Sequence, residues 1–301
     1  MKQQIKSSLI LLLTATIWGV AFVAQSVGME YIGPFTFNAI RCVLGGLVLI
    51  PVILVLKKKK ETETGTEGQE KEDKKTLWTG GIACGVILCI ASNLQQFGIM
   101  EASVGKSGFF TALYIVMIPV IGIFIGKRPG IKLWFCVALA VVGMYLLCMK
   151  DGSFTIERAD IMLLLCALAF SFHILVVDYF SPKVDGVKMS CIQFFVCGVL
   201  SAVGMLFTET PDISNIQAAW LPLLYAGLLS CGVGYTLQIV GQKGINPVIA
   251  SLIMSLESVI SALAGWVILG QVLSPKEILG CILMFVAIII TQIPIGNKKT
   301  D

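Results

Sequence analysis

The sequence is poor in charged residues and in histidine, and this scarcity argues against a soluble enzyme. Only 13% of its 301 residues are charged, and it contains one histidine, whereas a soluble domain usually carries about 25% charged residues. The patterns GxxxxGK[ST], HExxH and GxSxG are all absent. The chain therefore lacks the motif of an ATP-driven pump, of a zinc protease and of a serine hydrolase.

The ten cysteines are not arranged for disulfides or for zinc. All of them lie within apolar stretches, and no two form C-x-x-C. Such thiols usually behave as small hydrophobic side chains. We expect no structural metal and no other cofactor.

Long apolar runs are what the sequence has in abundance. It is 56% hydrophobic, and ten runs approach the roughly 20 residues that a helix needs to cross a bilayer. The runs are continuous and do not alternate apolar with polar residues, so helices are predicted and barrel strands are not. The first run has no A-x-A-like site after it and is predicted to be a retained span. The predicted spans are 7–27, 34–56, 77–98, 103–125, 131–149, 159–180, 187–207, 218–241, 245–269 and 277–295.

The ten spans fall into two sets of five that resemble each other. Residues 102–126 match residues 245–269 with a shift of 143, which places Tyr114 on Glu257. Because five is odd, a duplicated five-helix unit must enter the membrane in opposite orientations. We therefore predict an all-α integral membrane protein with ten transmembrane helices arranged as two inverted five-helix repeats. The predicted repeats are residues 1–149 and 158–295.

Basic residues are distributed unequally between the two sides of the predicted bundle. With the N-terminus inside, the inner segments hold 17 lysines and arginines and the outer segments hold four. The positive-inside rule then predicts a multi-pass protein of the cell (inner or plasma) membrane with both termini in the cytoplasm. Residues 57–75 contain no apolar residue and are predicted to form a charged cytoplasmic loop. We interpret the basic residues as loop anchors and expect no nucleic-acid partner.

Three stretches carry a resemblance to a known family. They are LESVISALAGWVILGQ at 256–271, its first-half copy LYIVMIPVIGIFIGKRP at 113–129, and TATIWGVAF near the N-terminus, with Arg41 in the second span. Together they resemble the EamA family of the drug/metabolite transporter superfamily, whose pattern runs from leucine-glutamate through proline and valine to glycine-glutamate. Ser258 stands where proline is usual, and Gln271 stands where glutamate is usual. The resemblance implies a transporter fold and leaves the substrate open.

Two charged residues inside the spans are candidates for function, because a charge at the centre of a membrane helix costs roughly 2.5–3.5 kcal/mol on insertion scales. Glu257 lies close to the middle of the ninth span and is our ion-coupling candidate, as a proton-titrating or cation-binding carboxylate. A helix-packing role explains it equally well. Arg41 could hold an anionic group of a substrate, or it could extend outward or pair with a carbonyl. With a shift of 152, its repeat mate is the neutral Gln193.

Neutral polar residues recur at matching positions in the two repeats. Tyr235 and Gln238 are three residues apart and share a helix face, and the shift of 143 places Gln95 on Gln238. Such residues line a cavity or join helices, at about 0.6 kcal/mol for each hydrogen bond. Trp18 is a candidate for stacking on a substrate or for core packing. His173 has no acidic neighbour one turn away, which favours a helix contact over a proton relay. The predicted substrate-binding residues are Trp18, Arg41, Asn93, Gln95, Gln96, Tyr114, His173, Gln193, Tyr235 and Gln238.

These features predict a secondary-active transporter, a permease or exporter, of a small polar or amphipathic metabolite such as an amino acid. It would work by alternating access in the lipid bilayer, with protons as the candidate coupling ion. The alternative is a membrane-embedded enzyme or lipid-handling protein, which would need a nucleophile, metal ligands or paired carboxylates that converge. A structural or sensor subunit fits the duplicated, polar-lined halves less well. The sequence leaves the substrate, the direction of transport and the oligomeric state open.

Overall fold

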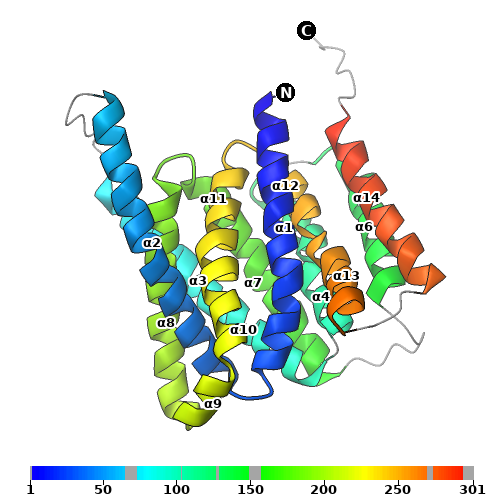
Figure 1. Cartoon of the computed structure of the whole chain (residues 1–301). Coiled ribbons are helices and arrows are strands. Elements are labelled where there is room, and N and C mark those ends of the chain that lie inside the picture. The colour runs from blue at the N-terminus through cyan, green and yellow to red at the C-terminus, as the bar shows by residue number, and fades with distance from the viewer. Residues whose placement is uncertain are drawn as a thin grey trace.

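The computed structural model describes residues 2–64, 73–102, 104–126, 129–148, 157–269 and 274–293, and all regular structure within these ranges is helical (Figure 1). Eight helical segments of this part of the chain are long and apolar enough to cross a membrane. They correspond to the predicted spans other than the fifth and the tenth. The fifth span contains a shorter apolar stretch, Ile131–Leu146. The prediction of an all-helical membrane protein is confirmed, and ten crossings stay a prediction.

The helices begin where polar residues interrupt the apolar runs. The side chains of Asp73, Asp185 and Asn246 accept hydrogen bonds from backbone amides at the starts of α3, α8 and α12, which satisfies donors that a helix start leaves free. In chain order the elements are α1 (Lys2–Gly28), α2 (Pro34–Thr64), α3 (Lys74–Glu101), α4 (Val104–Ala112), α5 (Tyr114–Phe124), α6 (Ile131–Cys148), α7 (Arg158–Phe180), α8 (Gly186–Thr208), α9 (Ile213–Ala218), α10 (Trp220–Leu224), the π-helix η1 (Tyr225–Tyr235), α11 (Thr236–Gln242), α12 (Pro247–Met254), α13 (Glu257–Leu269) and α14 (Pro275–Gln292).

One boundary differs clearly from the prediction. The charged segment 57–75 was expected to be a loop from its first residue, but α2 continues as a helix to Thr64. Lysine and glutamate, which fill this segment, are good helix formers, so the end of the apolar run does not end the helix. Residues 65–72 of the predicted loop lie outside the described residues.

Two predicted spans are broken in the middle rather than continuous. The fourth is divided into α4 and α5 at Leu113, and the ninth is divided into α12 and α13 at Ser255 and Leu256. The shift of 143 places Leu113 on Leu256, so the breaks fall at matching positions. The hydroxyl of Ser255 donates to the carbonyl of Leu252 (2.8 Å), and such side-chain bonds to the backbone compete with regular helix bonding. Each break is followed by a buried residue that begins the next helix, Tyr114 in α5 and Glu257 in α13.

The eighth predicted span is also irregular. It consists of α10, the π-helix η1 and α11. Its glycines allow close packing, because a Cβ added at Gly234 would lie 2.7 Å from Nε1 of Trp18 on α1. The matching first-half span, α3, is a single α-helix. Extended π-helical geometry is rare and often marks functional sites.

Two helix pairs that match under the repeat pack against each other in antiparallel fashion. Glu209, at the end of α8, accepts hydrogen bonds from the amides of Phe35 and Thr36 at the start of α2, both at 2.8 Å. Lys132, at the start of α6, donates to the carbonyls of Thr291 and Ile293 at the end of α14, at 3.3 and 2.5 Å. Each contact joins the end of one helix to the start of its mate, so the two helices of each pair run in opposite directions.

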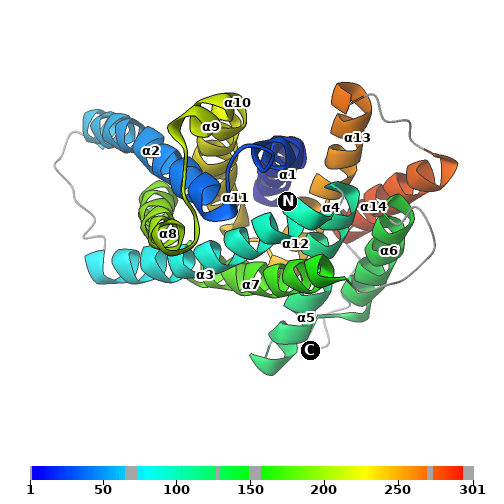
Figure 2. The ribbon, with the colours of Figure 1, turned by 90° about the horizontal axis from the view of Figure 1, so that it is seen from below.

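The start of α1 and the end of α14 lie at the same end of the bundle, which we call the termini face (Figure 1). Seen from the opposite end, α6 and α14 lie side by side at one edge, and α2 and α8 lie toward the other (Figure 2). Between them α1 packs against η1, α11 and α13, while α3 packs against α7 and α8. The largest hydrophobic core cluster draws residues from both predicted halves, which places the interior site between them.

Candidate functional site

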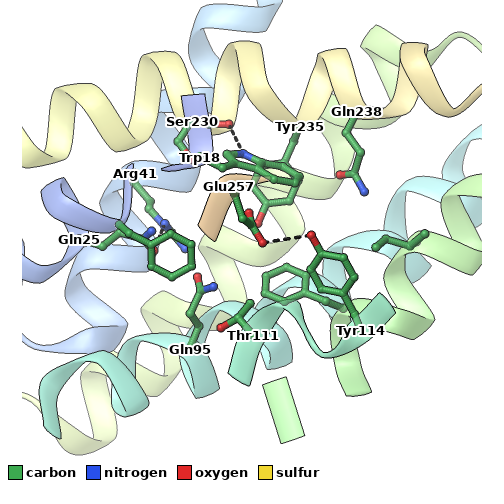
Figure 3. Close-up of a pocket in the computed structure, with 13 residues that line it drawn as sticks. Trp18, Gln25, Arg41, Gln95, Thr111, Tyr114, Ser230, Tyr235, Gln238 and Glu257 are labelled. Carbon is green, nitrogen blue, oxygen red and sulfur yellow. Dashed lines mark hydrogen bonds between the residues drawn. The ribbon is translucent and has the colours of Figure 1, made fainter. Parts of the chain in front are cut away.

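A pocket lies in the interior of the bundle, where both predicted halves contribute side chains (Figure 3). Its cavity volume is about 30 Å³, which is room for roughly one or two water molecules. A metabolite needs more space, so helices would have to separate to admit one. The lining residues are Trp18, Phe22 and Gln25 of α1, Arg41 of α2, Gln95 of α3, Thr111 of α4, Tyr114 of α5, Phe170 and Ile174 of α7, Ser230 and Tyr235 of η1, Gln238 of α11 and Glu257 of α13.

Glu257 and Tyr114 meet in this pocket. The phenol of Tyr114 donates a hydrogen bond to Oε1 of Glu257 over 3.1 Å (Figure 3). Tyr114 is the first residue of α5 and Glu257 the first residue of α13, so the helix breaks bring both to interior helix starts. The start of a helix carries partial positive charge, which stabilises a carboxylate placed there. Two residues that the repeat predicts to be equivalent are therefore in direct contact.

Arg41 reaches the same pocket from α2 and is only 2% exposed. One of its terminal nitrogens donates to Oε1 of Gln25 over 2.9 Å, and its guanidinium carbon lies 5.6 Å from the centre of the Phe37 ring. Its Nε is buried without a hydrogen-bond partner. The side chain is therefore directed into the protein and does not extend to the membrane surface. No carboxylate in the described part of the chain forms an ion pair with it.

Aromatic side chains form one wall of the pocket. The rings of Trp18 and Tyr235 are tilted against each other with centres 4.6 Å apart. The indole of Trp18 donates to the carbonyl of Ser230 in the π-helix over 3.4 Å. Tyr235 also contacts the rings of His173 and Phe194 edge-on. We call Trp18 and Tyr235 the aromatic wall.

Four predicted substrate-binding residues do not line the pocket. His173 and Gln193 bond to each other, with Nε2 and Oε1 3.1 Å apart. Asn93 donates to the hydroxyl of Ser201 over 3.0 Å and accepts from the amide of Asn38 over 2.9 Å. The Gln96 amide points to the sulfur of Met29. Their contacts join neighbouring helices, so a direct role in binding stays a prediction for these four.

The other seven predicted residues do line the pocket: Trp18, Arg41, Gln95, Tyr114, Tyr235, Gln238 and Glu257. The sequence interpretation missed Phe22, Gln25, Thr111, Phe170, Ile174 and Ser230. Two of these could have been found from Trp18, because Phe22 and Gln25 follow it at i+4 and i+7 on the same helix face. Gln271, where the family pattern has glutamate, lies outside the described residues.

A second cavity lies next to the central pocket. It has a volume of about 260 Å³ and is lined by mostly apolar residues of α5, α7 and α12 together with Pro129. Pro129 shortly precedes Lys132, which contacts the end of α14, so the cavity lies toward the termini face. Ile118 of this cavity is one helical turn beyond Tyr114, and Leu175 follows Ile174 of the central pocket. We call this cavity the vestibule.

The described residues contain no group of three or more histidines, cysteines or acidic residues placed to hold a metal ion. The cysteines in this part of the chain are free thiols. The thiols of Cys42 and Cys197 lie 3.4 Å apart between α2 and α8. The site is thus built from one cation, one carboxylate, amides and aromatic rings.

An apolar helical bundle with a polar interior pocket between its halves is the architecture of a membrane transporter. The sequence matches the EamA-like transporter family over residues 5–149 and 157–293, and the chain belongs to this family. It is a multi-pass membrane protein.

Relatives agree with this assignment, and a solved structure shares the fold. An uncharacterized transporter of Archaeoglobus fulgidus is 27% identical over 94% of this chain and 84% of its own length. The uncharacterized transporter YwfM of Bacillus subtilis is 23% identical over 97% of this chain and 96% of its own length. The uncharacterized transporter YoaV of the same organism is 22% identical over 94% of this chain and 95% of its own length. One protein of known crystal structure aligns with 95% of this chain and over 96% of its own chain, with a TM-score of 0.76 and 17% sequence identity. This is a likeness of fold.

Proposed function

We propose that this membrane transporter is secondary-active and carries a small polar or amphipathic metabolite through the central pocket by alternating access. The observation that carries the proposal is the pocket itself, which is lined by both Arg41 and Glu257, each buried and without an ion pair among the described residues. Burying unpaired charge is expensive, and a substrate or ion that binds it repays that cost. Because no nucleotide-binding motif is present, a solute or ion gradient would drive transport.

Alternating access fits the arrangement of the two cavities. The vestibule lies toward the termini face relative to the central pocket, with Ile118 of α5 lining the vestibule and Tyr114, one turn earlier, lining the central pocket. The antiparallel pairs α2 with α8 and α6 with α14 support two inverted repeats that rock against each other. We further propose ten crossings, both termini in the cytoplasm and a plasma-membrane location, with the vestibule on the cytoplasmic side.

Glu257 is the proposed coupling residue, with a proton as the coupling ion. The other charged or titratable groups that line the pocket are Arg41, Tyr114 and Tyr235. Glu257 is the carboxylic acid among these groups. Its carboxylate accepts a hydrogen bond from Tyr114, so protonation of Glu257 would alter this contact between α5 and α13. In proteoliposomes, Glu257→Gln should transport without the pH dependence of the wild type, and unchanged pH dependence would exclude coupling through this residue.

The transport function is tested by solute flux into liposomes that contain the purified chain. Trp18→Ala should reduce uptake, because it removes half of the aromatic wall. Trp78→Ala is the matched control, since Trp78 is 56% exposed on α3 and should leave uptake unchanged. If no metabolite mixture gives flux, and lipid transfer or hydrolysis is found instead, the transporter proposal is wrong. The chain would then be a lipid-handling protein or a membrane-embedded enzyme.

A further inference from the structure

Three cysteines from three different helices come together between α2, α3 and α8. The thiol of Cys42 on α2 donates to the sulfur of Cys197 on α8 over 3.4 Å, and the thiol of Cys197 hydrogen-bonds in turn to Cys89 on α3. None of the three lines the central pocket, and the proposed transport function gives them no role. The sequence did not indicate this cluster, because its members lie far apart in the chain.

Hydrogen-bonding groups surround the sulfur of Cys89. The side-chain amide of Asn93, one turn along α3, lies 3.4 Å from Sγ of Cys89 and donates to it, and the hydroxyl of Ser201 on α8 lies 3.6 Å from the same sulfur. Ser201 follows Cys197 by four residues, so both reach α3 from one face of α8. Donors placed around a sulfur stabilise the negative charge that it carries when it acts as a nucleophile.

Cys89 is also the member of the cluster that is partly exposed. Cys42 and Cys197 are 1% and 0% exposed, whereas Cys89 is half-buried. Val86, one turn earlier on α3, and the adjacent Ile90 are exposed apolar residues of a helix long enough to span the membrane. A reagent dissolved in the surrounding lipid therefore meets Cys89, while the other two thiols are shielded. Fully buried thiols are usually inert.

We propose that Cys89 and Cys197 form an oxidation site for hydroperoxides, in which Cys89 reacts first and Cys197 closes a disulfide onto it. The sulfur of Cys89 attacks a hydroperoxide ROOH, the O–O bond breaks, and the thiol proton passes to the leaving alkoxide. The products are a sulfenic acid at Cys89 and ROH. The sulfur of Cys197 then attacks the sulfur of Cys89, and hydroxide leaves with the second thiol proton as water. Two thiols and one hydroperoxide thus give a disulfide, ROH and water, the reversible branch of cysteine oxidation.

Such a disulfide would join the two predicted halves of the chain. Cys89 belongs to residues 1–149 and Cys197 to residues 158–295, and α3 packs against α8. A covalent bond between these helices restricts movement of one half against the other, so oxidation should slow transport and reduction should restore it. This consequence rests on the proposed function, whereas the oxidation site itself does not.

The experiment uses the purified full-length chain, reduced and reconstituted in liposomes of saturated lipid. It is treated with hydrogen peroxide or with cumene hydroperoxide, free thiols are blocked with N-ethylmaleimide, and linked peptides are identified by mass spectrometry. The wild type should form a link between Cys89 and Cys197. Free Cys89 should disappear about tenfold or more faster than free Cys281, a half-buried cysteine of α14, because nearby donors raise thiol reactivity. Equal rates at the two cysteines, or no such link, would overturn the proposal.

The two reagents distinguish the sources of the hydroperoxide group. Faster reaction with the apolar cumene hydroperoxide is expected from the position of Cys89 beside lipid-facing residues, and it would support oxidised lipid as the source. Faster reaction with hydrogen peroxide would support the oxidation site with the small peroxide as its reagent.

Three variants assign the roles. Cys197→Ser should stop at the sulfenic acid, which dimedone labels at Cys89. Cys89→Ser should give neither product, although it keeps the close pair of Cys42 and Cys197, and a disulfide between those two would refute the leading role of Cys89. Cys136→Ser, at a buried position of α6, should oxidise like the wild type. If Cys197→Ser does not fold, Cys197→Ala makes the same test.

Uptake separates this inference from the proposed function. Solute uptake is measured in the same liposomes before oxidation, after it, and after reduction with dithiothreitol. A disulfide that leaves uptake unchanged would support the oxidation site and refute its effect on transport. A clear disulfide together with no uptake of any solute by the reduced chain would support the site and count against secondary transport.

Discussion

The two predicted halves of the chain contain the same helix break and place different chemistry at it. In the first half the break at Leu113 is followed by Tyr114, and in the second the break at Leu256 is followed by Glu257. The two side chains meet across the pocket, 3.1 Å from oxygen to oxygen. The break lies at matching positions in the two predicted halves, whereas the group that faces the pocket differs. We infer that the repeated contacts stabilise the fold and that the unlike residues carry the function.

The matching helices α3 and η1 also differ between the two predicted halves, in their backbone geometry. The shift of 143 places Ala91 of the regular helix α3 on Gly234 of the π-helix, where Trp18 packs against the backbone. In the second half this position is π-helical, and the carbonyl of Ser230 accepts a hydrogen bond from the indole of Trp18. At both positions the second half contributes a polar group, the Glu257 carboxylate or the Ser230 carbonyl, to a pocket that the first half also lines with Trp18, Arg41 and Tyr114.

The largest predicted effect contrasts Glu257 with its mate. Glu257→Gln should reduce concentrative transport about tenfold or more, because a hydrogen bond or ion contact to a charged group contributes about 1.5–3 kcal/mol. Tyr114→Phe removes the bond and keeps the carboxylate, so its effect should be clearly smaller. Initial uptake rates in proteoliposomes measure both, with Tyr31→Phe, an exposed phenol, as the control. Equal losses at the two positions would contradict the asymmetry.

A second prediction concerns overpacking at the π-helix. Gly234→Ala should lower stability by about 1–3 kcal/mol, because the added methyl would lie within 2.7 Å of the Trp18 indole nitrogen. The reverse change at its mate, Ala91→Gly, should cost about 0.5–1 kcal/mol, chiefly from chain entropy. Thermal unfolding in detergent compares the two variants. If both variants lose the same stability and Gly234→Ala leaves the indole fluorescence unchanged, close packing against Trp18 does not explain the glycine at this position.

A third prediction concerns the contact between α8 and α2. Glu209 binds the amides of Phe35 and Thr36 and the hydroxyl of Thr36, so it caps α2 from another helix. Glu209→Ala should lower stability by about 1–2 kcal/mol, as for other lost helix caps. Unfolding midpoints check this, with Glu30→Ala as an exposed control. A midpoint that matches the control would show that the cap contributes nothing measurable.

The smallest effect is expected at the other antiparallel pair. Lys132→Met removes the donor to the carbonyls of Thr291 and Ile293 but keeps the apolar part of the side chain. We expect a loss of about 0.5–1 kcal/mol, because a cation at a helix C-terminus contributes that much near the surface. Salt should screen the effect. A loss larger than that of Glu209→Ala would reverse the ranking of the two pairs.

The sequence predicted the helix positions well because hydrocarbon length and continuous apolar runs set them. It did not predict the breaks, because each span as a whole is apolar enough to be taken for one continuous helix. At the second break the hydroxyl of Ser255 bonds to the carbonyl of Leu252. The π-helix was missed for a related reason, since π and α geometry differ in hydrogen-bond register and not in composition.

For the site, charge inside a span was the reliable signal. It found Arg41 and Glu257, because such residues are costly and seldom lie there without a role. Polarity alone was less specific, since His173 and Gln193 bond to each other behind Tyr235 and do not line the pocket. Gln25 was missed although it follows Trp18 at i+7 on the same face of α1, because an uncharged amide does not by itself indicate a site.

The cap that Glu209 places on α2 has a consequence for biosynthesis. The amide of Phe35 and the carboxylate that binds it are 174 residues apart in the chain. When α2 enters the membrane, the segment that contains Glu209 has not yet left the ribosome. The first turn of α2 must therefore rely on water or lipid headgroups until α8 is inserted, and the N-terminal half cannot reach its final structure before α7 and α8 of the C-terminal half have been made.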